Sequence, residues 1–415
     1  MSTLTEKLLS RGQSEGITDW KIYKLKNVAK VERGRFSHRP RNDPRFFGGQ
    51  HPFIQTADIV IGNGKIKSAS QSINDEGLKI SKMFPRGTLM MAIAANIGDC
   101  SILTFDSACT DSVVGITPDR ELLNGNFLLY YLSTQKSVFK YVAPAGAQKN
   151  INVEFLDSLP LLIPPLPEQQ KIAEILGACD KAIEAQERLI AQKQQRKKGL
   201  MQKLLTGEVR FPEFERTPEW KYISLNTVST RLTEKVGKRA LDVLSITAGY
   251  GYVAQKDKFS KVIAGRNYTN YVVLDNGDFS YNKGNSLRFP QGCIYRLDEY
   301  ERGAVPNVFY SFRMNSEKTV SGFYVQLFKM GYQNKQLRAY INSGVRNDGL
   351  LNLTNKDFFK MELPVPSIKE QQVLSDFFAS LDHEITLQQN KLEQLKQHKK
   401  GLMQLLLTGK VRVKI

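Results

Sequence analysis

The sequence predicts an α+β protein in which two globular α+β domains are separated by two long helices that form an antiparallel coiled coil. One helical segment occurs twice, from Glu168 to Arg210 and from Glu370 to Arg412, with about 20 of 43 positions identical and no gap. A weaker echo starts each half, where a tryptophan, a leucine and a valine recur at one spacing: Trp20, Leu25, Val28 and Trp220, Leu225, Val228. The chain is therefore an internal repeat with an approximate two-fold relation between its halves.

These repeats divide the chain into six predicted segments. The ranges are an N-terminal extension at 1–19, a first globular domain at 20–163, a first helical spacer at 164–210, a linker at 211–219, a second globular domain at 220–365 and a second helical spacer at 366–415.

Each globular segment combines short β-like runs with one late helix. In the first segment, runs such as DIVIG and LMMAIA are broken by Gly and Asn clusters, and a helix is expected from Asn126 to Val142. In the second, strands are expected in DVLSITAGYGYVAQ, NYVVLDNGDFSYNKG and CIYRL, and the late helix in FYVQLFKMGYQNKQLRAYI. The order of elements matches although the residues have diverged.

Each long helix is expected to begin after a proline-rich corner and to stop at a glycine, Gly207 or Gly409. Glu168 and Glu370 lie near the positive end of the helix dipole. Apolar residues alternate in steps of three and four, which predicts a coiled-coil seam. The seam residues are Ile172, Leu176, Cys179, Ile183, Ile190, Leu200 and Leu204 in the first copy, and Leu374, Phe378, Leu381, Ile385, Leu392, Leu395, Leu402 and Leu406 in the second.

A helix of roughly 38 residues is about 57 Å long, so antiparallel pairing would place the globular domains at opposite ends of a rod. Gln186 and Gln388 interrupt the seam at the same point of both copies. These glutamines either fix the register of the paired helices or tilt into solvent at the edge of the seam.

The composition points to a polyanionic ligand. The chain carries 59 Lys and Arg against 41 Asp and Glu, a net charge of +18, with 10% aromatic residues. Nucleic acid is the commonest polyanion for such a protein, and the alternative is an ordinary basic protein without such a ligand.

Cysteine spacing and hydropathy argue against several classes of protein. The four cysteines, Cys100, Cys109, Cys179 and Cys293, form no CxxC pair, so neither a zinc site nor a disulfide framework is predicted and buried thiols are expected. No stretch approaches the roughly 18 apolar residues of a membrane span, and the N-terminus has no apolar signal region. We expect a soluble, cytoplasmic protein without membrane contact.

Three segments carry a family resemblance: PLPEQQKIAEILGACD, KGLMQKLLTGEVRF, and FSYNKG at Phe279 to Gly284. With the alternation of variable domains and repeated helices, they resemble the specificity subunit of prokaryotic type I restriction-modification systems. The resemblance covers nearly all of the chain after about residue 18. It implies two target-recognition domains that each read one half of a split, asymmetric site in double-stranded DNA. It also implies that the helices measure the unread spacer.

The same resemblance implies the partners. Two methyltransferase subunits would dock on the helices and, through them, restriction and translocase subunits would join the complex. S-adenosylmethionine, ATP and magnesium are then expected only in those partner subunits, and no cofactor in this chain.

Basic loops are the candidate DNA-binding sites of the first domain. The segment VERGRFSHRPRNDPRFFGGQH concentrates arginines in a Gly- and Pro-punctuated loop, and such arginines can pair with phosphates or with guanine O6 and N7. A solvated loop without a DNA role is the alternative. A second loop offers Gln and Asn, which suit the adenine edge but are also ordinary turn residues. The candidates are Arg33, Arg35, Arg39, Arg41, Arg45, Gln148, Lys149 and Asn150.

The second domain offers a comparable set in RLTEKVGKR, AGYGYVAQ, YNKGNSLRF and NSGVRNDGLLN. For the YNK run, the alternative interpretation is a structural strand end, and glycine-flanked tyrosines are also normal in β-sheets. The candidates are Lys235, Lys238, Arg239, Tyr250, Asn282, Lys283, Arg288, Arg346 and Asn347.

The repeated helix ends are candidates for partner docking, because GLMQ and LLTG recur so closely. The expected apolar anchors are Leu200, Met201, Leu204, Leu205, Leu402, Met403, Leu406 and Leu407. Packing within the helix pair is the competing interpretation of these side chains.

Catalytic motifs are missing from the sequence. It contains no methylation tetrapeptide, no P-loop and no HExxH or other metal-ligand grouping. We therefore expect a non-enzymatic DNA reader with no catalytic or metal site. The alternative function is a basic coiled-coil scaffold that binds nucleic acid without sequence specificity, and an autonomous DNA-modifying enzyme is a third, weaker hypothesis.

Overall fold

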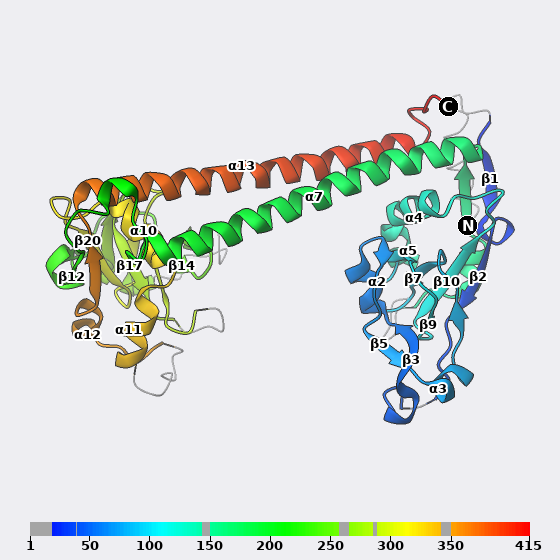
Figure 1. Cartoon of the computed structure of the whole chain (residues 1–415), viewed down its shortest axis with the longest axis horizontal. Coiled ribbons are helices and arrows are strands. Elements are labelled where there is room, and N and C mark those ends of the chain that lie inside the picture. The colour runs from blue at the N-terminus through cyan, green and yellow to red at the C-terminus, as the bar shows by residue number, and fades with distance from the viewer. Residues whose placement is uncertain (1–18, 39, 143–149, 257–264, 285–288, 342–349) are drawn as a thin grey trace. The chain divides into compact units, whose positions relative to one another are not determined.

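The computed structural model describes residues 19–38, 40–142, 150–256, 265–284, 289–341 and 350–415 (Figure 1). The chain divides into two compact units. The first unit runs up to Glu187 and also contains Lys391–Ile415, and the second is Arg188–Asn390. Each unit therefore combines one globular domain with part of both long helices.

The first unit is built around two sheets and a strand pair. The five-stranded sheet has the order β2-β10-β7-β8-β4, the four-stranded sheet has the order β5-β3-β9-β6, and β1 pairs with β11. The strands are β1 (Lys21–Lys24), β2 (Ala29–Arg33), β3 (Phe47–Ile54), β4 (Lys65–Ile66), β5 (Gln71–Ile73), β6 (Met83–Phe84), β7 (Leu89–Ala92), β8 (Cys100–Leu103), β9 (Ser107–Cys109), β10 (Val113–Pro118) and β11 (Pro160–Ile163). The helices are α2 (Thr56–Gly62), α3 (Asp75–Lys79), α4 (Gly125–Thr134), α5 (Lys136–Val142), α6 (Val153–Asp157) and the start of α7 (Leu166–Leu204), with short 3-10 turns at Leu25–Asn27 and Pro44–Phe46.

The second unit repeats this plan with a smaller main sheet. Its four-stranded sheet has the order β13-β20-β17-β18, and three strand pairs join β14 to β15, β16 to β19 and β12 to β21. The strands are β12 (Lys221–Ser224), β13 (Ser229–Arg231), β14 (Leu244–Thr247), β15 (Gly251–Ala254), β16 (Val272–Asp275), β17 (Phe279–Asn282), β18 (Cys293–Arg296), β19 (Arg302–Val305), β20 (Tyr310–Met314) and β21 (Glu362–Val365). The helices are α8 (Leu225–Val228), α10 (Ser321–Lys329), α11 (Gln333–Tyr340), α12 (Asn355–Phe359) and the start of α13 (Ile368–Leu406), with 3-10 turns at Pro212–Phe214 and Gly265–Asn270.

A strand pair closes each globular domain just before its long helix. β1 runs antiparallel to β11, with Ile22 opposite Leu162, and β12 runs antiparallel to β21, with Ile223 opposite Leu363. The first strand of each domain is thereby tied to the last, and the proline-rich corner then leads into α7 or α13. The two domains share this closure although their sheets differ.

The repeated EQQ motif fixes each helix start to its own domain. The side chain of Gln169 accepts a hydrogen bond from the Asn124 N–H at 2.8 Å and donates to the carbonyls of Leu122 and Pro164 at 2.9 Å. Gln371 makes the same three bonds, with the Val320 N–H and the carbonyls of Lys318 and Pro366. Both glutamines are fully buried, so satisfying their amides requires this arrangement.

Within each unit the helices pair in opposite directions, as predicted. In the first unit, Asp180 and Glu187 of α7 bind Lys399 and Lys396 of α13 at 2.6 and 2.8 Å. Residue numbers rise along one helix as they fall along the other, so the pairing is antiparallel. In the second unit, Lys193 of α7 binds Glu384 of α13 at 2.6 Å, and Lys197 binds Asp382.

The helix ends lie slightly before the predicted glycines. Regular helix ends at Leu204 and Leu406, and Gly207 and Gly409 adopt φ of 77° and 78°. In this left-handed conformation the chain turns back, and the Val209 N–H reaches the Lys203 carbonyl at 3.2 Å. At the interruption of the seam, Gln186 is only 6% exposed, so the interpretation that it tilts into solvent is wrong.

Two predictions of secondary structure need correction. The run DIVIG is helix α2 rather than a strand, because Asp58 accepts hydrogen bonds from the Gln55 N–H and from Ser70 and so caps a helix start. The expected late helices are each broken in two: α4 and α5 separate at Gln135, and α10 and α11 separate at Gly331, whose φ is 81°. The strand predicted in LMMAIA is confirmed as β7.

Candidate nucleic-acid interface

The arginine-rich loop of the first domain follows β2 and surrounds an aromatic cluster. Phe36 is buried and packs against Phe46, Phe47 and Phe53 with ring centroids 5.3 to 6.1 Å apart. This apolar base holds the loop backbone, so the arginines extend outward. The loop is therefore anchored rather than merely solvated.

Acidic side chains and carbonyls position these arginines. The Arg41 guanidinium binds the Asp111 carboxylate at 2.8 Å, and Arg33 Nε donates to the Asp111 carbonyl at 2.6 Å. Arg35 donates to the Ser81 carbonyl at 2.9 Å. Arg45 binds Asp43 at 2.8 Å, and its hydrogen bond holds the pKa of that carboxyl well below its usual range.

Of the predicted site in the first domain, Arg33, Arg35, Arg41 and Arg45 are exposed and belong to one loop region. Arg39, Gln148 and Lys149 lie outside the described residues. Asn150 is half-buried and bridges Ala94 beside β7, which gives it a structural contact.

The basic segment of the second domain lies between β13 and β14. Lys235, Lys238 and Arg239 are all exposed. Arg239 binds Glu234 at 2.5 Å, while Lys235 Nζ donates to the Asn270 side chain at 3.3 Å. The cationic charge of this segment therefore remains at the surface.

Tyr250 lies at the tip of the β14–β15 hairpin and is 83% exposed. Gly249 and Gly251 on either side have φ of 90° and 95°, and the Gly249 N–H donates to the Tyr295 hydroxyl at 2.8 Å. A fixed hairpin thus presents an exposed aromatic ring, which is suited to stacking on a base.

Asn282 does not fit the predicted DNA-binding role. Its side chain donates to the Ile246 carbonyl at 3.1 Å and accepts from the Gly284 N–H at 2.9 Å, so both ends of the amide are used internally. The structural interpretation of the YNK run is therefore favoured at this position. Lys283 is half-buried over the Tyr310 ring, 5.1 Å from its centroid. Arg288, Arg346 and Asn347 lie outside the described residues.

The predicted partner anchors are mostly internal, which favours the competing interpretation that they pack within the chain. Met201, Leu204 and Leu205 are buried in the core of the second unit, and Leu406 and Leu407 in the core of the first. A side chain at most 7% exposed in its own core has no apolar surface to offer a partner. Leu200, Leu402 and Met403 are partly buried against the same cores.

Each unit contains a hydrogen-bonded cluster of one Trp, one Glu and one Arg, called a Trp–Glu–Arg lock below, which the sequence did not predict. Arg412 binds the buried Glu168 at 2.7 Å, and the indole N–H of Trp20 donates to that carboxylate at 3.1 Å. In the second unit Arg210 binds Glu370 at 2.6 Å, and Trp220 donates to it at 3.1 Å. The repetition of Trp, Glu and Arg was visible in the sequence, but their mutual contact was not.

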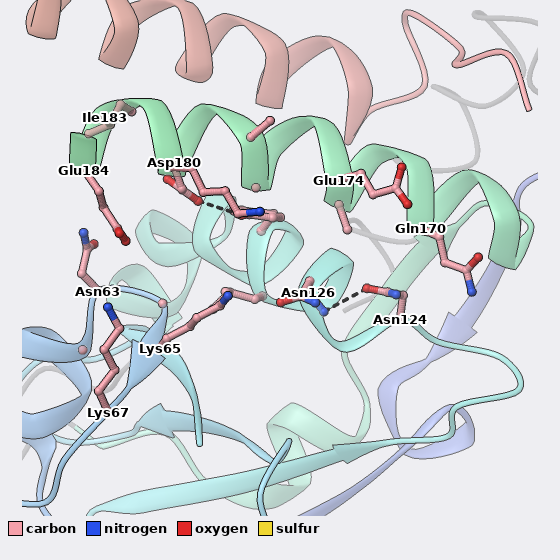
Figure 2. A pocket seen from close by; sticks show the side chains of 18 of the residues that line it. Asn63, Lys65, Lys67, Asn124, Asn126, Gln170, Glu174, Asp180, Ile183 and Glu184 are labelled. Carbon is pink, nitrogen blue, oxygen red and sulfur yellow. Dashed lines mark hydrogen bonds between the residues drawn. The ribbon is translucent and has the colours of Figure 1, made fainter. Parts of the chain in front are cut away.

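A hollow of about 630 Å³ follows α7 in the first unit. Figure 2 shows Lys65 and Lys67 of the domain across from Glu184 and Asp180 of the helix. Polar side chains of both signs line this groove.

The described residues include neither a metal-binding cluster nor an activated thiol. No group of three or more His, Cys, Asp or Glu among them is placed to hold a metal ion. Burial raises the pKa of Cys293 to about 11 and raises the pKa values of Cys100, Cys109 and Cys179, so these thiols stay protonated at neutral pH. In the part of the chain that the structure covers, no helix is both long and apolar enough to span a membrane.

Comparisons with known proteins agree with this architecture. The family model of the type I restriction modification DNA specificity domain matches residues 17–192. The type I restriction enzyme MjaVIII specificity subunit of Methanocaldococcus jannaschii is 24% identical, covering 95% of this chain and 94% of the relative. The putative MjaX specificity subunit of the same organism is 28% identical, covering 72% and 71%.

Solved structures support the fold in the same way. The specificity subunit of the type I restriction-modification system from M. genitalium aligns with a TM-score of 0.56 at 15% identity, over 94% of this chain and 96% of that chain. The two unlike domains, the duplicated helices and the matching relatives agree: residues 17–192 match the type I restriction modification DNA specificity domain, and nearly the whole chain is similar to a type I restriction enzyme specificity subunit.

Proposed function

We propose that this chain is the non-catalytic DNA-specificity subunit of a type I restriction-modification complex. The domains at 20–163 and 220–365 act as two target-recognition domains, each reading one half of a bipartite, asymmetric site. The observation that carries this proposal is the contrast within the repeat: the helices and their locks are alike, while the exposed loops of the two domains are not.

That contrast has a physical reason. Two unlike half-sites need different loop surfaces, as base edges are told apart by the pattern of donors and acceptors. A partner subunit that docks in two copies needs two equivalent docking surfaces. We propose that two methyltransferase subunits dock along the helical part, and that restriction and translocase subunits join through them. Chemistry that requires S-adenosylmethionine, ATP or magnesium then belongs to the partners.

The net charge of +18 supplies the non-specific part of DNA binding. Exposed Lys and Arg release counterions from the phosphate backbone, which makes such binding steeply dependent on salt. Sequence preference must come from base-edge contacts instead, for which Arg41 is the described candidate, while Tyr250 can add stacking on a base.

The test is purification of the tagged chain from its native cell, followed by selection from a random duplex pool near physiological salt. We expect a methyltransferase to co-purify and the selected DNA to contain two short, unlike sequences around a gap of fixed length. Strongly salt-dependent binding without any enriched sequence, and without a partner, would instead favour a basic coiled-coil scaffold.

A further inference from the structure

We propose that Asp111 is a positioning residue for DNA reading, and that it orients Arg41 toward a guanine in the half-site read by the first domain. The proposal rests on the proposed function, because it assumes that this domain reads DNA. Asp111 lies in the turn between β9 and β10, about 70 residues along the chain from the arginine loop.

The backbone beside Asp111 is fixed by a close approach. A Cβ atom at Gly34 would lie 2.2 Å from the Thr110 carbonyl oxygen and 2.4 Å from Cys109 Sγ, so only glycine fits there. The Gly34 N–H also donates to the Val113 carbonyl at 2.8 Å. The end of β2 and the turn that carries Asp111 are thus held against each other.

From this position Asp111 binds Arg41 and Arg33 among the described residues. Both oxygens of its carboxylate lie 2.8 Å from one terminal nitrogen, Nη2, of Arg41, and its carbonyl accepts a hydrogen bond from Arg33 Nε at 2.6 Å. The Asp111 side chain is 23% exposed, whereas that of Arg41 is 51% exposed. The carboxylate is therefore partly enclosed while the guanidinium reaches solvent.

This arrangement favours a base edge over a phosphate. A carboxylate beside the guanidinium offsets its charge, which weakens attraction to the phosphate backbone. The Arg41 guanidinium is planar, so its other N–H donors stay in one plane. Guanine O6 and N7 form an acceptor pair that matches this geometry. Holding Nη2 of Arg41 in advance also reduces the rotamer entropy lost on binding.

A cavity of about 190 Å³ lies beside Arg41. Phe36 and Phe53, 2% and 1% exposed, lie at its base, and Thr56, Thr110 and Ser112 contribute hydroxyl groups. An apolar base with a polar rim admits the edge of a base and excludes loosely held water. Arg41 thus lines a recess rather than a flat surface.

The test uses the complete chain with its co-purified partner and a random pool of DNA duplexes. We expect the wild-type protein to enrich guanine at one position of one half-site. Asp111→Ala and Arg41→Lys should both reduce the preference for guanine at that same position by at least tenfold. Asp111→Ala frees the Arg41 guanidinium from its fixed orientation, and Arg41→Lys replaces the guanidinium while keeping the positive charge. The other half-site should be unchanged.

The matched control is Glu76→Ala, which removes a carboxylate from an exposed pair with Lys79 in the same domain and so changes net charge equally. It should leave the selected sequence intact. An unchanged sequence with Asp111→Ala, or equal weakening of both half-sites, would overturn the proposal. If Asp111→Ala does not fold, the proposal is tested by Arg41→Lys, and an unchanged preference for guanine with that variant would overturn it. A wild-type protein that enriches no sequence would refute the proposed function itself.

Discussion

At the scale of single residues, the Trp–Glu–Arg locks explain why the chain repeats its helix motif so closely. Glu370 is 1% exposed, and an isolated carboxylate at that depth would be strongly unfavourable. Arg210 supplies two hydrogen bonds to it and also bonds to the Thr217 and Pro218 carbonyls. The last residue of the repeated motif is therefore needed to neutralise one of the first.

Arg210→Ala should destabilise the second unit by about 3–5 kcal/mol, because it leaves a buried carboxylate without its cation. That corresponds to a fall of roughly 10 °C in the midpoint of the unit's thermal transition. Arg412→Ala should destabilise the first unit less, since Arg412 is 39% exposed against 13% for Arg210 and water can reach the remaining charge.

Differential scanning calorimetry on each variant measures both effects. Arg216→Ala is the control, because Arg216 is an exposed arginine in the same segment. A shift with Arg216→Ala as large as that with Arg210→Ala would contradict the lock.

The sequence identified the arginine loop but not how its side chains are held. Arg35 and Arg41 could be predicted as exposed cations from their neighbours in the chain. Their partners, Ser81 and Asp111, lie 46 and 70 residues away, and no local pattern reveals such contacts. The internal hydrogen bond from Asn282 to the distant Ile246 carbonyl could not be predicted for the same reason.

At the scale of elements, charge is distributed unevenly along both long helices. Of the acids that pair between the helices, Asp180, Asp382 and Glu384 lie in the first half of their helix and Glu187 lies just past the middle of α7. Their lysine partners, Lys193, Lys197, Lys396 and Lys399, lie in the second halves. Antiparallel pairing sets the acidic half of one helix against the basic half of the other. Parallel pairing would set like charges together, so the pattern favours the observed direction.

Exchanging one of these pairs tests that explanation. Lys197→Asp should lower stability by about 1–3 kcal/mol, because it loses a charged hydrogen bond and faces Asp382. Adding Asp382→Lys should restore part of the loss, measured as a coupling energy from urea unfolding of the single and double variants.

Lys198→Asp is the matched control, since Lys198 is the exposed neighbour of Lys197 and the net charge changes equally. Strict additivity of the two substitutions would show that Lys197 and Asp382 do not stabilise the helix pair through each other.

Regular elements were predicted well where one periodicity dominated. The long helices have many turns of amphipathic pattern, and their predicted ends differ from the observed ends by only a few residues. The strand prediction for DIVIG failed because five apolar-rich residues fit a strand or a helix equally well, and the capping box that marks the helix start includes Gln55, outside that window.

At the scale of the whole molecule, the chain passes between its two compact units only inside helices. α7 leaves the first unit after Glu187 and α13 returns to it after Asn390. A helix has a fixed rise per residue, so the connection has a length set by the number of residues. We propose that this length sets the spacer between the two half-sites.

Inserting a heptad near Ala191 in α7, together with a heptad near Asn390 in α13, tests this role. Seven residues add two turns, about 10.5 Å, and keep the seam in phase. At about 3.4 Å per base pair, the selected spacer should lengthen by roughly three base pairs. Both half-site sequences should be unchanged, because the loops that read them are untouched. A heptad in α7 alone is the control and should reduce stability by misaligning the charged pairs. Altered half-site bases with an unchanged spacer would refute the helices as a ruler.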